Sequence, residues 1–147
     1  MPRASKRLVV VADMAKRKED EAAAILADRQ KKLEEEKQRS GDLLAYYSEY
    51  ETKFQQRTQG LRAESLMQNR EFLQQLANSC EIQRSEVARI QQEVDIAIAF
   101  WHQCHLKHEK LREHIAKLSK DEDSALEALE QKSVDEWVAQ NFSRNKI

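Results

Sequence analysis

The side chains best suited to chemistry gather in the second half of the chain, where four histidines flank a cysteine: His102, Cys104, His105, His108 and His114. Cys104 and His108 are four residues apart, which places both on one face of a helix, where they could bind zinc. Cys80 is the one further candidate ligand, and it lies roughly 36 Å away along a helix. Cys104 and His108 also fall on positions of an apolar helical repeat. We therefore favour packing over metal binding and expect no cofactor.

Catalysis finds no support in the sequence. A glycine-rich phosphate loop, a His-Glu-x-x-His pair and a serine elbow are all absent, and the chain has only two glycines and one proline. We expect a protein that is not an enzyme and that works by contacts with other molecules.

The dominant feature is a repeat of three and four residues that runs from Leu66 to Leu118. Most of its positions are apolar, which predicts one narrow seam along a helix of roughly 80 Å, the pattern that a coiled-coil partner buries. Its positions are Leu66, Asn69, Leu73, Leu76, Cys80, Gln83, Val87, Ile90, Val94, Ala97, Trp101, Cys104, His108, Leu111, Ile115 and Leu118.

A weaker seam precedes it and predicts a first helix over residues 5–56, with Ser5 as its N-cap. The seam positions are Leu8, Ala12, Ala15, Glu19, Ala22, Leu26, Arg29, Leu33, Glu36, Ser40, Leu43 or Leu44, Tyr47, Tyr50 and Phe54. The pattern lapses over residues 57–62, which indicates a turn and an antiparallel partner helix over 63–118. Residues whose numbers sum to roughly 120 should then face one another, so that the N-terminus of the first helix lies opposite Ile115.

The fold expected is all-α: a long antiparallel two-helix coiled-coil hairpin, forming one elongated domain over residues 1–147 with a C-terminal helical overhang. The overhang, to about residue 142, either continues the second helix or follows a break near Ser119. Its apolar residues predict a docking surface, while folding back and self-association stay open as alternatives. They are Leu126, Leu129, Val134, Trp137, Val138 and Phe142.

The composition of the chain limits the classes of partner that we expect. The formal net charge is −1, with 25 basic and 26 acidic residues, so nothing in the overall balance favours nucleic acid or an anionic membrane. No segment approaches the ~20 apolar residues of a membrane span, and we expect no direct membrane insertion. The two cysteines lie too far apart on one helix to pair, which is typical of reduced thiols in a cytoplasmic protein.

Two quartets near the turn share a spacing of four, three and four residues. Their members are Arg39, Leu43, Tyr46 and Tyr50 in the first helix and Phe72, Leu76, Ser79 and Gln83 in the second. Leu43, Tyr50 and Leu76 fit simple core positions. Tyr46 and Phe72 lie off the seam, which predicts exposed aromatic residues of the kind that protein partners bury.

These residues, with others, resemble the FliJ family of the bacterial flagellar type III export apparatus. The resemblance covers nearly the whole chain and rests on the order of several short motifs: Tyr46-x-x-x-Tyr50, Asn69-x-x-Phe72-x-x-x-Leu76, Val94-Asp95-x-Ala97 before Trp101, and Glu130-Gln131-Lys132-x-x-Asp135-Glu136.

The resemblance implies a non-enzymatic stalk-like adaptor, cytoplasmic and peripheral at the inner membrane through the export apparatus. Its implied partners are the flagellar export ATPase ring and its regulator, the export gate membrane protein, and export chaperones. By position, the gate-binding surface falls on the two quartets, although this chain departs from the family pattern at Arg39, Ser79 and Gln83. A surface for the ATPase ring is expected at Leu126, Leu129, Val134 and Trp137.

Two other classes stay open from the sequence. A holdase chaperone with a helical grip would bind many unfolded clients, and a scaffold coiled coil would form parallel dimers. The resemblance also leaves open whether export serves a flagellum or a related virulence secretion system.

Overall fold

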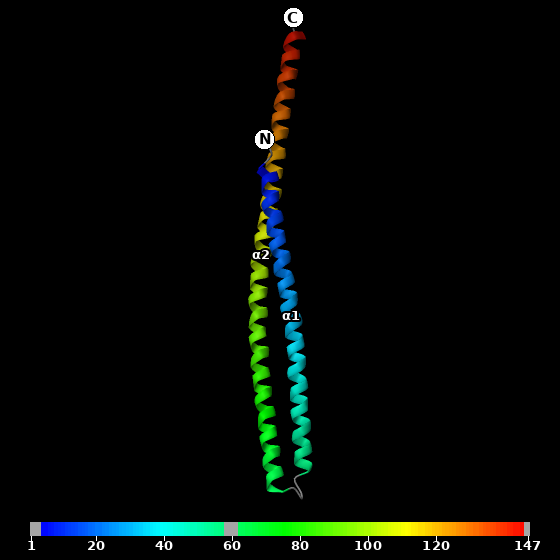
Figure 1. Ribbon diagram of the computed structural model, residues 1–147. Coiled ribbons are helices and arrows are strands. Elements are labelled where there is room, and N and C mark those ends of the chain that lie inside the picture. Colours follow the sequence, from blue (N-terminus) through cyan, green and yellow to red (C-terminus); the bar gives the residue numbers. More distant parts are fainter. Residues whose placement is uncertain (1–3, 58–61, 146–147) are drawn as a thin grey trace. The chain divides into compact units, whose positions relative to one another are not determined.

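The computed structural model describes residues 4–57 and 62–145, and over these residues it contains two long helices and no strand. Helix α1 spans Ala4–Gln56 and helix α2 spans Ala63–Asn145 (Figure 1). The acidic Glu64 lies in the first turn of α2, and the basic Lys53 and Arg144 lie in the last turns of α1 and α2. Each charge therefore interacts favourably with the helix dipole. The predicted all-α fold with two packed helices is confirmed.

The chain divides into two compact units, each of which contains part of both helices. We name Glu21–Trp101 the hairpin unit, and Met1–Asp20 together with His102–Ile147 the terminal unit. Of the predicted turn at residues 57–62, residues 58–61 lie outside the described residues. The organisation of residues 1–147 as one domain stays a prediction.

In the hairpin unit, the two helices pack antiparallel around branched aliphatic side chains. Ile90 is fully buried, and Leu33 and Val94 are 6% and 3% exposed. Leu26 and Val87 pack against these three, so α1 and α2 both contribute to the core. Leu33 and Val87, whose numbers sum to 120, thus belong to the same core.

The seam positions predicted from the sequence are buried or half-buried in both units. On α2 this holds for every position of the repeat between Leu66 and Leu118, and on α1 for every position from Leu8 to Phe54. At the one place where two residues were possible, Leu43 is half-buried and Leu44 is 51% exposed. A regular repeat of apolar residues is thus sufficient to locate the packed face of each helix.

In the terminal unit, the start of α1 contacts α2 through Ser5 and Glu122. The Ser5 backbone N–H donates to Glu122 Oε1 at 3.1 Å, and Ser5 Oγ donates to Glu122 Oε2 at 2.7 Å. Two expectations are therefore wrong. The N-terminus of the first helix does not lie opposite Ile115, and Ser5 is not the N-cap, because α1 already begins at Ala4. Side chains lean toward the N-terminus of their own helix, which in an antiparallel pair shifts contacts toward higher α2 numbers and accounts for part of the difference.

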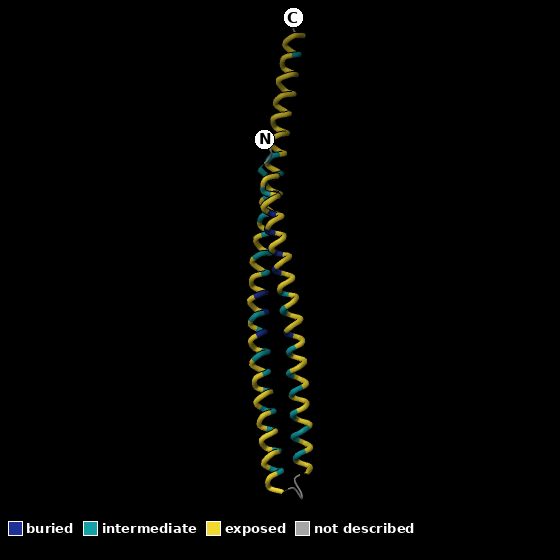
Figure 2. The backbone as a smooth tube through the Cα atoms, viewed as in Figure 1, coloured by how far each residue is buried: buried dark blue, intermediate teal, exposed yellow. Residues whose placement is uncertain are grey.

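Helix α2 runs without interruption through Ser119 and extends beyond its contact with Ser5. In Figure 1 this part of α2, drawn orange to red, continues past the blue start of α1 within the terminal unit. Figure 2 shows it almost entirely exposed; of the described residues 123–145, only Asn141 is half-buried. We name residues 123–145 the α2 extension. Neither helix contains a described stretch that is apolar enough to cross a bilayer.

Candidate protein-interaction surfaces

An aromatic cluster joins the two helices of the hairpin unit near the end of α1 and the beginning of α2. The ring of Tyr50 lies 4.6 Å from that of Tyr46, 5.7 Å from that of Phe54 and 5.2 Å from that of Phe72, measured between centroids. Phe54 and Phe72 are themselves in edge contact at 6.2 Å. Tyr50 on α1 and Phe72 on α2 therefore hold the helices together at this level through aromatic packing.

The outer members of the cluster remain accessible. Tyr46 is 45% exposed and Phe72 is 39% exposed, as their positions off the seam predicted. The Tyr46 hydroxyl bonds to that of Tyr50 at 3.1 Å, and this hydrogen bond is the main cause that raises the pKa of Tyr46. Both rings are thus exposed and also held in place by Tyr50, which lowers the entropy that a partner would have to overcome on binding.

A groove of about 410 Å³ brings four of the predicted surface residues together. Its lining consists of Arg39, Asp42, Leu43, Tyr46 and Gln83. Of the other predicted members, Tyr50 and Leu76 are half-buried, whereas Phe72 and Ser79 are exposed. Tyr50 and Phe72 belong to the aromatic cluster. The groove combines an apolar floor with a cation, a carboxylate and an amide, a composition that suits a polypeptide partner better than a small metabolite.

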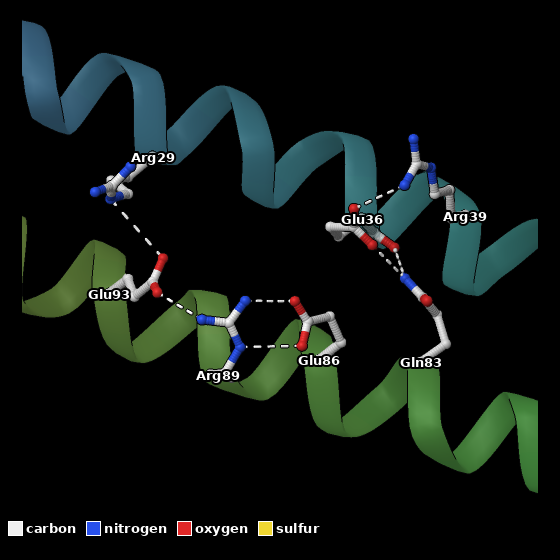
Figure 3. Close-up of polar contacts among 7 residues, drawn as sticks. All are labelled: Arg29, Glu36, Arg39, Gln83, Glu86, Arg89 and Glu93. Atoms are coloured by element: carbon white, nitrogen blue, oxygen red, sulfur yellow. Dashed lines mark hydrogen bonds and ion pairs between the residues drawn. The ribbon is translucent and has the colours of Figure 1, made fainter.

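The polar side of this groove is fixed by contacts that Figure 3 shows. The Gln83 amide on α2 donates to the Glu36 carboxylate at 2.5 Å and to the Glu36 backbone carbonyl at 3.3 Å. Arg39 in turn donates to Glu36 at 3.0 Å. Glu36, which interrupts the apolar seam in the sequence, therefore links α1 to α2 and orients two of the predicted surface residues.

Further along the hairpin unit, a chain of charges crosses from one helix to the other (Figure 3). Arg89 binds Glu86 at 2.5 and 3.0 Å and Glu93 at 2.6 Å, and Glu93 lies 3.8 Å from Arg29 on α1. The Arg89 guanidinium lowers the pKa of Glu86, and the same bond raises the pKa of Arg89. Arg29 thus interrupts the seam at a position where α2 supplies a carboxylate.

A larger groove was not anticipated from the sequence. It has a volume of about 580 Å³ and lies on the other flank of the seam, where it is lined by Tyr47, Glu51, Phe54, Gln55, Ala63, Leu66, Met67, Asn69, Arg70 and Leu73. The available signal was Met67, an apolar residue next to the seam that is 66% exposed. An isolated exposed methionine is too common to predict a groove without knowing which helix faces it.

In the terminal unit, two of the histidines, His105 and His108, contact a buried carboxylate. His105 Nδ1 and His108 Nδ1 lie 3.0 Å and 2.7 Å from the two carboxylate oxygens of Glu19, which is 8% exposed. The bond to His105 is the main cause that lowers the pKa of Glu19, while burial acts in the opposite direction. Within residues 4–57 and 62–145, no group of histidine, cysteine and acidic side chains could hold a metal ion. These histidines instead satisfy a buried carboxylate, a pairing that sequence reasoning missed.

The residues predicted to contact an ATPase ring lie on the α2 extension and are all exposed. Leu126 is 45% exposed, Leu129 65%, Val134 54% and Trp137 64%. Large apolar side chains so exposed along one helix are typical of a surface that another protein covers.

The comparison with protein families identifies the chain. The family model described as "FliJ: Flagellar FliJ protein" matches residues 5–146, which is nearly its full length. Comparisons with curated proteins and with solved structures gave no match. The suspected resemblance is confirmed, and it agrees with a chain of two long helices. The chain belongs to the FliJ family and is a protein related to flagellar export, a role in which the family is not enzymatic.

Proposed function

We propose that this protein is a stalk-like adaptor that contacts the flagellar export ATPase ring with one unit and the export gate with the other. The family match over residues 5–146 carries the proposal. It is supported by the presence of exposed aromatic or apolar side chains in both units, at positions that suit two different partners. An adaptor needs only two such surfaces on the same chain and no reactive group.

The gate surface consists of the eight quartet residues of the hairpin unit. The groove beside Arg39 and Tyr46 offers a pocket for an apolar anchor of the partner, and Phe72 offers a second contact from α2. Because the Glu36 contacts hold Arg39 and Gln83 in place, the polar rim is ordered before the partner arrives. Aromatic residues in such a setting are frequent sites of high binding energy.

The ring surface consists of Leu126, Leu129, Val134 and Trp137 of the α2 extension. A single helix is narrow, roughly 10 Å across with its side chains, and can enter the central opening of a ring. The ATPase regulator and export chaperones are further proposed partners. The protein would then act in the cytoplasm, peripheral to the inner membrane through the export apparatus.

Two sets of substitutions, one in each surface, test this assignment. The variant with both Tyr46→Ala and Phe72→Ala should weaken binding to the cytoplasmic part of the gate protein by at least about tenfold in calorimetric titration, because two aromatic contacts are lost. It should still stimulate ATP hydrolysis by the ring. Trp137→Ala should show the opposite pattern.

Ile82→Ala provides the matched control, since Ile82 lies in the hairpin unit and is 71% exposed but belongs to neither surface. It should change neither measurement. If both test variants retained full binding and full stimulation, with helicity unchanged by circular dichroism, the two surfaces would be wrongly assigned.

A further inference from the structure

The terminal unit exposes apolar side chains on both of its helices. On the outer side of α1, Val10 is 62% exposed and Met14 is 57% exposed, and they lie four residues apart on one face. On the α2 extension, Val134 and Trp137 are 54% and 64% exposed and lie three residues apart. Both helices therefore present a short apolar strip toward solvent.

The charges beside the two strips have opposite signs. On α1 most of the exposed charges beside the strip are cations, Lys6, Arg7, Arg17 and Lys18, and Asp13 is the one exposed carboxylate among them. On the α2 extension the flanking charges are mainly carboxylates, also exposed: Glu127, Glu130, Asp135 and Glu136. Such a pattern favours contact between the two strips, because apolar burial and charge attraction then act together.

The two strips of a single chain cannot meet. Ser5 at the start of α1 contacts Glu122, and α2 continues from there as an uninterrupted helix to Asn145. The α2 extension therefore leads away from the α1 segment that complements it, as Figure 1 also shows for this unit. A second copy of the chain can supply the missing contact.

We propose that two copies of this protein associate through their terminal units, with the α2 extension of each copy packed on the outer face of α1 in the other. A two-fold axis near Glu122 makes both contacts identical, the arrangement that most homodimers use. The extension covers roughly 33 Å and is therefore long enough to span the α1 segment of this unit, which covers roughly 25 Å.

Alignment of the two apolar strips sets a register. Because α1 and α2 are antiparallel within a copy, the α2 extension runs parallel to α1 of the other copy. Placing Val134 beside Met14 puts Glu127 near Arg7. It also places Trp137 near Arg17, where the guanidinium can stack on the indole ring.

The association itself goes beyond the proposed function and does not rest on it, whereas its consequence for ring binding does. The dimer covers Val134 and Trp137, which the proposed ring surface also uses, so a dimeric copy cannot engage the ring through them. Self-association would hold the protein in reserve until the ring displaces the second copy. The test uses the protein alone, so its outcome is independent of any ATPase or gate measurement.

Sedimentation of the full chain at increasing concentration, at about 50 mM and 500 mM salt, tests the association. We expect a monomer–dimer equilibrium that is at least about tenfold weaker at the higher salt, since charge pairs in the contact are screened. Trp137→Ala should raise the dimer dissociation constant by at least about tenfold. Ile82→Ala, which truncates a similarly exposed side chain in the hairpin unit, should leave it unchanged.

Charge reversal tests the register. Arg7→Glu and Glu127→Arg should each weaken the dimer severalfold, because each places like charges together in both symmetric contacts. The chain that carries both changes should regain much of the lost affinity. A chain that stays monomeric up to about 100 µM at low salt overturns the proposal, as does a dimer insensitive to Trp137→Ala, or a double variant no tighter than the single ones.

Discussion

In the hairpin unit, branched aliphatic and aromatic side chains occupy much of the seam beside the buried Ala22 and Ala97, whereas in the terminal unit the most buried positions of α1 are alanine, serine and glutamate. Ile90 and Val94 pack with Leu33 in the first case. In the second, Ser5 and Glu19 are held by side chains of α2 through hydrogen bonds. Large apolar side chains thus dominate the pairing in the hairpin unit, whereas buried polar side chains contribute more in the terminal unit, beside the half-buried Leu8, Leu111, Ile115 and Leu118.

The difference matters for how each unit selects its pairing. Aliphatic side chains bury much surface, at about 25 cal/mol per Å², but a seam of similar side chains tolerates a shift of one repeat. Buried alanines contribute less, yet a carboxylate that must meet two imidazoles allows only one register. We therefore expect the hairpin unit to supply most of the stability and the terminal unit to be the more specific in its register.

Ile90→Ala should have the largest effect on stability. The Ile90 side chain is fully buried, and its truncation should lower the free energy of unfolding by about 2–4 kcal/mol, because a cavity remains in a narrow two-helix core. Faster hydrogen exchange over Glu21–Trp101 would report the loss. Ile82→Ala in the same unit should change exchange very little, and an equal effect of the two variants would contradict a core centred on Ile90.

Most of the fold could be predicted from the sequence because a coiled-coil seam depends on local periodicity. The repeat through Val87, Ile90 and Val94 requires only that apolar residues recur every three or four positions. The absence of proline or glycine after Gly60 likewise favours the uninterrupted α2 that is observed. The exposure of Tyr46 and Phe72 followed from their positions beside the seam.

The polar contacts of the hairpin unit follow from the sequence register, whereas those of the terminal unit do not. Residue numbers that sum to roughly 120 place Glu36 opposite residue 84, next to its observed partner Gln83. The same sum places Glu19 opposite Trp101, whereas its observed partners are His105 and His108, an error of one to two helical turns. Such an error leaves an apolar seam intact but assigns a polar partner wrongly.

Glu19→Gln should have a smaller effect, restricted to the terminal unit. Glutamine keeps the volume but cannot accept from both His105 and His108 as a carboxylate does, so about 1–2 kcal/mol of local stability should be lost. Hydrogen exchange should increase in α1 before Asp20 and in α2 after His102. Asp13→Asn is the matched control because Asp13 is exposed in the same segment of α1. Equal protection of Glu19→Gln and wild-type protein would show that the polar seam contributes nothing.

The pH dependence of the stability difference between wild-type protein and Glu19→Gln should be the smallest effect and the most specific one. The bonds from His105 and His108, and the nearby Lys16, lower the pKa of Glu19 below its ordinary value of 4.5. The unfolded chain therefore binds the Glu19 proton more tightly than the folded chain does. The stabilisation is complete above about pH 4.5 and is lost as the pH falls through the lowered pKa.

Urea unfolding of wild-type protein and Glu19→Gln, followed by circular dichroism, should thus show midpoints that differ at pH 6 and draw together as the pH falls below 4.5. Glu86→Gln in the hairpin unit gives the comparison, because Arg89 also lowers the pKa of Glu86. The Glu86 side chain is 37% exposed and that of Glu19 only 11%. About 0.5 M salt should therefore remove the effect of Glu86→Gln on the midpoint but preserve much of the effect of Glu19→Gln. Midpoints for Glu19→Gln that stay equally separated down to pH 3 would mean that its carboxylate charge does not hold the terminal unit together.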